Sequence, residues 1–262
     1  MTAEKQKVTR EIIINKLVAA LEPADHIQAF WEGGAAAYNR TDEWSDIDLY
    51  LLVADEKVAA AFKDVEKALA ELAPIKQKLE VHQIQWPDVS QAFYRLEEAN
   101  EYLIIDLAAI KTCSPEKFLA PEIHGNAVFY FNKPPEIKPT PLNKDAFIKK
   151  LNERLEQLRA RFKMFNNFVQ KEINRGNLLE AIELYRTLTL ATLIEALRIK
   201  HNPIHCDFKT RYIHYELPSG IIEELERLSF IENEKDLQDK YLQTTELAKQ
   251  ILESKPFPAG VI

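Results

Sequence analysis

The chain has 262 residues, enough for one large domain or two smaller ones, each able to bury a core of its own. Hydrophobic residues make up 46% and charged residues 29%, which is ordinary for a globular protein and excludes a disordered chain. The formal net charge is −7, and this acidity argues against general affinity for nucleic acid, which depends on Lys and Arg. A cationic small substrate would suit this charge better.

The first half of the chain predicts a mixture of helices and strands, as in an α/β or α+β domain. Helical spacing of apolar residues predicts helices over residues 9–21, with Thr9 as the N-cap, and over residues 57–72. Apolar runs of strand length occupy residues 27–31, 47–53, 79–86 and 102–110, and a small Ala-rich element spans residues 35–38.

The second half predicts helices only, and a Pro-rich segment separates it from the first. The sequence NKPPEIKPTP contains four prolines, which neither a helix nor a central strand accommodates. We therefore predict domains at residues 1–131 and 143–262 with a linker at residues 132–142. In the second domain, one stripe of apolar residues at helical spacing predicts a helix that begins at Asn143 and ends at Gly176. Further helices are expected over residues 178–201, 221–228 and 236–252.

The segment GGAAAYNRTDEWSDIDLYLLV, residues 33–53, has the pattern most informative about function. Because side chains alternate along a strand, Asp46 and Asp48 should project from one face and the apolar residues between them from the other. Two such close carboxylates repel each other, and a hard cation compensates that repulsion. Oxygen ligands with no His or Cys nearby favour Mg²⁺ over zinc.

Two further features belong with this pair of aspartates. Asp106 is the only charged residue in the apolar run 102–110, and a buried lone carboxylate costs several kcal/mol unless a partner such as a metal ion offsets it. Gly33 and Gly34 let the backbone approach a ligand closely, and the helix after them would offer N–H groups to a phosphate.

Residues 34–49 resemble the GSxA(x)nSDIDL signature of the DNA polymerase beta-like nucleotidyltransferase superfamily, in particular the bacterial aminoglycoside nucleotidyltransferases. Gly34 matches the motif glycine, Ala35 stands at the serine position, and residues 45–49 match SDIDL in full. Asp106 falls where the family has its third metal-binding aspartate. A helical domain after the catalytic domain is similar too.

The resemblance implies an α/β (α+β) nucleotidyltransferase domain with a small mixed sheet, followed by an all-α helical bundle. The implied reaction moves a nucleoside monophosphate, AMP from ATP, to a hydroxyl of a small, aminoglycoside-like acceptor and releases pyrophosphate. Asp46 and Asp48 would bind the Mg²⁺ that bridges the triphosphate, and with Asp106 they would hold a second ion near the attacking hydroxyl. Asp106 would also accept the hydroxyl proton.

Six residues are candidates for contacting the nucleotide: Gly33, Gly34, Ala35, Ser45, Lys209 and Arg211. Where family members have a serine hydroxyl, Ala35 leaves only backbone N–H groups for the terminal phosphates. Ser45 would orient the turn before Asp46, or be a plain turn hydroxyl. Lys209 and Arg211 lie in a basic loop, residues 201–215, that either reaches the triphosphate or is simply solvated.

Other functions remain open at this point. The missing serine favours a noncatalytic, nucleotide-binding regulator. A third possibility is a toxin–antitoxin nucleotidyltransferase that modifies a protein partner, with a helical part resembling a HEPN-type RNase, since Arg198 to His205 reads R-x6-H. We expect a cytoplasmic monomer or homodimer without nucleic-acid or membrane partners, because neither a signal peptide nor a membrane-length apolar run is found.

Overall fold

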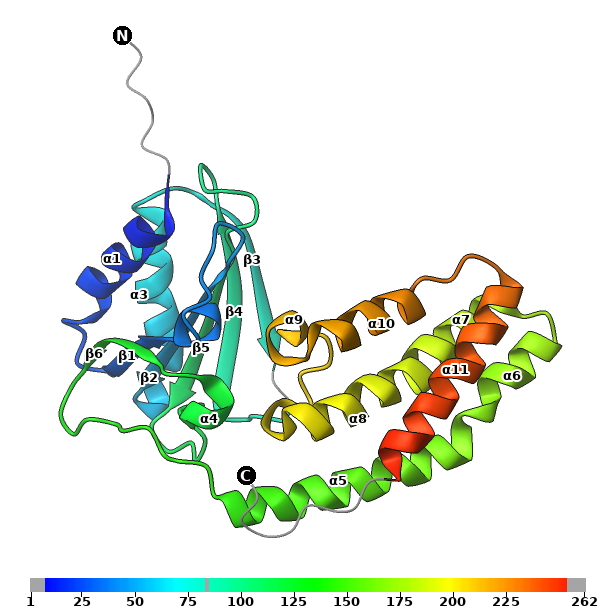
Figure 1. The fold of residues 1–262 in the computed structure, drawn as a ribbon. Helices are drawn as coiled ribbons and strands as arrows, with labels where there is room; N and C mark the ends of the chain where they lie inside the picture. Colours follow the sequence, from blue (N-terminus) through cyan, green and yellow to red (C-terminus); the bar gives the residue numbers. More distant parts are fainter. Residues whose placement is uncertain (1–7, 83–84, 254–262) are drawn as a thin grey trace. The chain divides into compact units, whose positions relative to one another are not determined.

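The computed structural model describes residues 8–82 and 85–253, and the chain forms two compact units, Met1–Leu142 and Asn143–Ile262 (Figure 1). The first unit is built on a mixed six-stranded sheet, and the second is helical. The predicted fold class, an α+β domain followed by a helical one, is confirmed.

The strands of the first unit are ordered β3-β4-β5-β2-β1-β6 across the sheet. Their bounds are β1 Ile27–Glu32, β2 Ile47–Val53, β3 Ile75–His82, β4 Val89–Leu96, β5 Ile105–Lys111 and β6 Val128–Asn132. β2 and β5 run parallel, and all other neighbours are antiparallel. The helices are α1 Arg10–Leu21, α2 Gly34–Ala37, η1 Asp55–Lys57, α3 Val58–Ala70 and α4 Pro121–His124.

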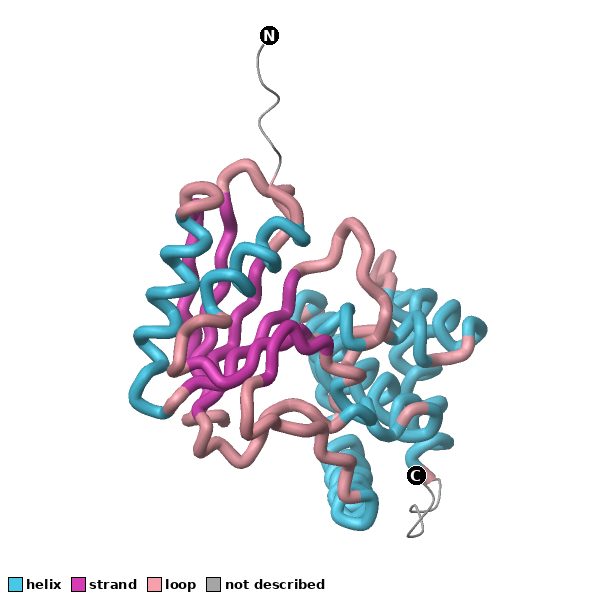
Figure 2. Tube along the Cα trace, turned by 90° about the vertical axis from the view of Figure 1, so that its left-hand side faces the viewer, coloured by secondary structure: helices cyan, strands magenta, loops and turns pink. Residues whose placement is uncertain are grey.

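The two faces of the sheet differ, and this difference positions the site. α1 and α3 lie side by side on one face, where the odd-numbered residues of β2 from Ile47 to Val53 join their core (Figure 2). The opposite face has Asp48 and Tyr50 in turn, and then Leu52, which belongs to a second apolar cluster. The predicted alternation along this strand is confirmed. The N-cap of α1 is confirmed too, since Thr9 Oγ1 accepts from the N–H of Ile12 at 3.4 Å.

Two strands of the sheet were not predicted. In β4 Ala92, Tyr94 and Leu96 are buried on one face while Gln91, Phe93 and Arg95 are half-buried on the other. The apolar Phe93 on the half-buried face obscures the polar alternation that would predict a strand. β6 is a short aromatic strand directly before the Pro-rich segment. The run predicted at 79–86 is displaced to β3, and its residues 83–84 lie outside the described residues. β5 begins at Ile105 rather than at residue 102.

The Pro-rich segment belongs to the first unit, which ends at Leu142. Asn132 exchanges side-chain hydrogen bonds with the backbone of Ile137, at 2.8 and 3.1 Å. Gln28 of β1 donates its side-chain amide to the carbonyl of Pro135 at 2.5 Å. These bonds attach the segment to the edge strand β6 and to its neighbour β1.

In the helical unit, the first long predicted helix is broken at Asn166, whereas the second, residues 178–201, is continuous and contains a π-helical stretch. The elements of this unit are α5 Lys144–Phe165, α6 Asn167–Asn174, α7 Leu178–Leu184, η2 Tyr185–Leu190 (a π-helical stretch), α8 Ala191–His201, η3 Pro203–His205, α9 Ile213–Glu216, α10 Ser219–Ser229 and α11 Glu234–Leu252. The predicted N-cap Asn143 is confirmed by its bond from the N–H of Ala146.

The break at Asn166 lies between α5 and α6. Its buried amide bonds the hydroxyls of Thr189 and Thr245, at 2.7 and 3.0 Å, so a polar network inside the bundle is satisfied at this break. Within the described residues, none of the helices combines the length and the apolar character needed to cross a lipid bilayer.

Candidate active site

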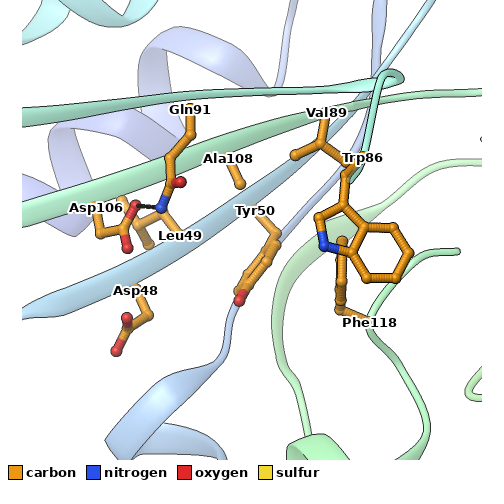
Figure 3. A pocket seen from close by; sticks show the side chains of 9 residues that line it. All are labelled: Asp48, Leu49, Tyr50, Trp86, Val89, Gln91, Asp106, Ala108 and Phe118. Atoms are coloured by element: carbon orange, nitrogen blue, oxygen red, sulfur yellow. Dashed lines mark hydrogen bonds between the residues drawn. The ribbon is translucent and has the colours of Figure 1, made fainter. Parts of the chain in front are cut away.

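The centre of the candidate site is a pair of carboxylates on neighbouring parallel strands. Asp48 of β2 and Asp106 of β5 are direct register partners. Because in-register side chains of adjacent strands project from the same face, both carboxylates line one pocket (Figure 3). The two aspartates are 58 positions apart in the numbering, and only the β2–β5 pairing brings them together.

Gly33 and Gly34 lie in close contact with this site. Gly33 donates its N–H to the carbonyl of Asp48 at 2.9 Å, which joins the turn after β1 to the start of β2. Gly34 has a φ of +51°, and a Cβ built on it would lie 1.7 Å from Asp48 Oδ2. A Cβ on Gly33 would lie 2.8 Å from the ring of Tyr50. Position 34 therefore requires glycine, because Asp48 occupies the space of a side chain there, and a side chain at position 33 would require the Tyr50 ring to move.

Gln91 of β4 holds the second carboxylate. Its Nε2 donates to Asp106 Oδ1 at 2.6 Å, as the dashed line in Figure 3 shows. Burial raises the pKa of Asp106 to about 6, the Gln91 hydrogen bond opposes the rise, and the charge of Asp46 adds to it. Sequence reasoning missed Gln91, because the strand that carries it was not predicted.

Asp46 lies just before β2 and is exposed. Its carbonyl accepts from Arg10 Nη1 at 2.7 Å, and Arg10 also forms an ion pair with the buried Glu32 at the end of β1. Tyr130 donates its hydroxyl to the same Glu32 at 2.5 Å. The backbone of Asp46 is thereby fixed from α1, β1 and β6, while its side chain faces solvent.

The fit of this acidic group to a metal is best for the Asp48–Asp106 pair. Among residues 8–82 and 85–253, no three His, Cys, Asp or Glu side chains gather closely enough to form a metal-binding group, although the charge of Asp46 acts on Asp106. Mg²⁺ in phosphoryl-transfer sites is commonly bound by one or two carboxylates together with water and substrate phosphates. Two carboxylates facing one pocket, one of them partly desolvated, match that requirement.

Three aromatic side chains form the other end of the same pocket: Tyr50, Trp86 and Phe118. The rings of Trp86 and Phe118 meet edge to face with centroids 5.2 Å apart, and Tyr50 lies 6.1 Å from Phe118. Tyr50 follows Asp48 by two positions, so the strand period places it on this face. The sequence pattern contains this signal for Tyr50 but none for Phe118, which enters from a loop.

Ser45 lies in the turn before Asp46, where its hydroxyl donates to Asp42 Oδ1 at 2.8 Å and accepts from the N–H of Asp42 at 2.9 Å. The structure thus assigns Ser45 a bond within the turn. Contact between Ser45 and a nucleotide stays a prediction.

Lys209 and Arg211 belong to the helical unit, in an exposed loop wrapped around Arg198. The fully buried Arg198 donates Nε to the carbonyl of Lys209 at 2.5 Å and Nη2 to that of Arg211, and Nη1 pairs with Glu216 at 2.6 Å. His205 is buried as well and bonds Glu216 at 2.8 Å. Contact of Lys209 and Arg211 with a triphosphate stays a prediction.

This network bears on the R-x6-H motif. Arg198 is 0% exposed and His205 is 5% exposed, so both are committed to the packing of the loop rather than presented to an RNA strand. The motif therefore has a structural explanation within the helical unit.

Comparisons with known proteins complete the description. No protein-family profile matches the chain, and no curated protein matches its sequence. Among solved structures, the chain is similar to an aminoglycoside 6-adenyltransferase from Bacillus subtilis, with 14% identity, a TM-score of 0.32, and coverage of 94% of this chain and 90% of that one.

Proposed function

We propose that the protein is a Mg²⁺-dependent nucleotidyltransferase that moves a nucleoside monophosphate, AMP from ATP, to a hydroxyl of a small-molecule acceptor and releases pyrophosphate. The observation that carries the proposal is the in-register pair Asp48 and Asp106, with Gly34 so close that a Cβ would overlap Asp48. The SDIDL resemblance of residues 45–49 agrees with this site in type and position.

Each part of the site has a role in this reaction. Asp48 and Asp106 would hold Mg²⁺, with Asp46 at the margin. When bound, the metal supplies positive charge for the triphosphate and the attacking oxygen. The terminal phosphates would lie against the backbone of Gly34 and Ala35, next to Asp48. Gln91 keeps Asp106 Oδ1 engaged, so the proton of the acceptor hydroxyl would pass to Asp106 Oδ2.

The test is a screen of small hydroxylated acceptors, cationic amino sugars included, with labelled ATP and Mg²⁺, in which pyrophosphate release is measured. Asp48→Asn and Asp106→Asn should each lower the rate by at least about 100-fold, because charge stabilisation is the main contribution to phosphoryl transfer. Asp64→Asn is the matched control, since Asp64 is a half-exposed carboxylate on α3. It should leave the rate unchanged.

The absence of the motif serine favours one alternative, a noncatalytic protein that binds a nucleotide as a regulator. Such a protein would bind Mg²⁺-ATP, lose that binding in Asp48→Asn, and release no pyrophosphate with any acceptor. If wild-type protein binds neither Mg²⁺-ATP nor Mg²⁺-tripolyphosphate, both functions are excluded.

A further inference from the structure

The pocket beside the paired carboxylates has two chemically different ends. Figure 3 shows Asp48 and Asp106 at one end, Trp86 and Phe118 at the other, and Tyr50 between them. The lining contains two acids, one amide and otherwise apolar or aromatic residues, and it contains no Lys, Arg or His. A ligand that fits this pocket combines a metal-bound or phosphate group at one end with a flat, uncharged ring at the other.

The size of the pocket indicates that only part of a ligand enters it. Its volume is about 180 Å³, below the range of roughly 300–1,000 Å³ for pockets that enclose a whole drug-sized molecule. A single ring system fits this volume better than a complete nucleotide or a complete multi-ring acceptor.

The backbone of one residue at the aromatic end has an unusual conformation. Phe118 has a φ of +56°, which bulky side chains rarely adopt. Its ring contacts those of Tyr50, Trp86 and His124. Trp86 keeps 39% of its surface exposed, although its edge is packed on Phe118. Strained backbone of this kind is concentrated at ligand clamps, and a half-exposed indole leaves ring area for a ligand.

The pocket runs along β2 from the carboxylates to the aromatic rings. Tyr50 lies two residues beyond Asp48, a step of about 6–7 Å, and Trp86 and Phe118 lie at the far end (Figure 3). A nucleotide has both groups that these two ends would bind, a phosphate and a flat ring.

We infer that Tyr50, Trp86 and Phe118 form a stacking subsite for the base of the nucleotide. This inference rests on the proposed function and adds to it the part of the chain that binds the base. Stacking on aromatic side chains tolerates every base, because each has a π face, and it favours the larger purine ring. The subsite therefore prefers purine over pyrimidine nucleotides.

The experiment compares Mg²⁺-ATP with Mg²⁺-tripolyphosphate by calorimetric titration, without an acceptor. Trp86→Ala should weaken Mg²⁺-ATP on the order of 10- to 100-fold, as expected for the loss of one base–aromatic stack, and leave Mg²⁺-tripolyphosphate unchanged. Trp86→Phe should keep the affinity for Mg²⁺-ATP within about 3-fold, because a phenyl ring preserves the stack. Trp44→Ala is the matched control, since Trp44 is 60% exposed and lies outside the pocket lining.

Fluorescence gives a second measurement that loss of folding would not mimic. Mg²⁺-ATP should quench tryptophan emission in the wild type and in Trp44→Phe, and this quenching should disappear in Trp86→Phe while binding persists. Mg²⁺-CTP should bind more weakly than Mg²⁺-ATP, and the difference should shrink in Trp86→Ala.

The results separate the subsite from the proposed function. If Trp86→Ala binds Mg²⁺-ATP as the wild type does, or weakens tripolyphosphate equally, the stacking subsite is refuted while metal-dependent nucleotide binding stands. If the wild type binds neither probe, the proposed function fails, and the subsite fails with it.

Discussion

At Asp106, burial and a hydrogen bond act in opposite directions on the pKa of one side chain. Desolvation raises its pKa to about 6, and the amide of Gln91 restores part of the preference for the charged form. In a sequence, a lone Asp within an apolar run signals this conflict. What it leaves undetermined is the partner, because Asp48 and Gln91 reach Asp106 only through the pairing of β5 with β2 and β4.

The raised pKa predicts a pH dependence of stability for the protein in EDTA. Between the ordinary value of 3.8 and about 6, the folded protein binds more protons at Asp106 than the unfolded chain does. The free energy of unfolding should therefore fall as pH rises through this window, by about 1–3 kcal/mol, a figure reduced for partial solvent screening. Asp106→Asn should remove this fall.

Denaturant titrations of the wild type and of Asp106→Asn at pH 4 and pH 8 test this prediction. The free energy of unfolding of Asp106→Asn minus that of the wild type should be larger at pH 8 than at pH 4. An unchanged difference between the two proteins at both pH values would contradict the raised pKa.

At the scale of elements, the contact of α2 with β2 depends on one glycine. Gly34→Ala combines a left-handed φ with overlap against Asp48, and we expect it to lower the free energy of unfolding by about 2–5 kcal/mol. Gly176→Ala is the matched control, because Gly176 has a φ of +74° but nothing within 4 Å of a built Cβ. It should cost about 1–2 kcal/mol. Equal losses in chemical denaturation would show that Asp48 does not limit the space at Gly34.

The loop after α8 depends on Arg198 in a comparable way. Arg198→Ala removes a buried cation that bonds three backbone carbonyls and breaks its ion pair with Glu216, so we expect a loss of about 3–5 kcal/mol. Trypsin should then cleave faster after Lys209 and Arg211. Arg154→Ala, which breaks a half-exposed pair with Glu195, should cost about 1 kcal/mol or less. Proteolysis that is equally slow in both variants would contradict this role of Arg198.

At the scale of the whole molecule, the balance of charge predicts how the protein behaves toward polyanions. With a formal net charge of −7, it should pass unretained through heparin or double-stranded DNA columns at about 0.15 M salt. Retention that weakens as salt increases would reveal a localised basic surface and would contradict the prediction. The elution profile is the measurement.

The sequence by itself determined the class of each half and the position of the candidate site. Strand-length apolar runs and helical stripes are local patterns, and so are the SDIDL segment and the Gly pair that carries the phosphate-site hypothesis. The bounds of β2 and the capping residues Thr9 and Asn143 agree with the structure for that reason.

Only the tertiary structure decided which groups meet. Polar and apolar residues do not alternate regularly along β4, so neither the strand nor Gln91 was visible from sequence. Phe118 reaches the pocket from a loop, and Arg198, read as part of a catalytic motif, is buried as the centre of a loop. Strand pairing and burial join residues far apart in the chain, and a local pattern contains no information about such partners.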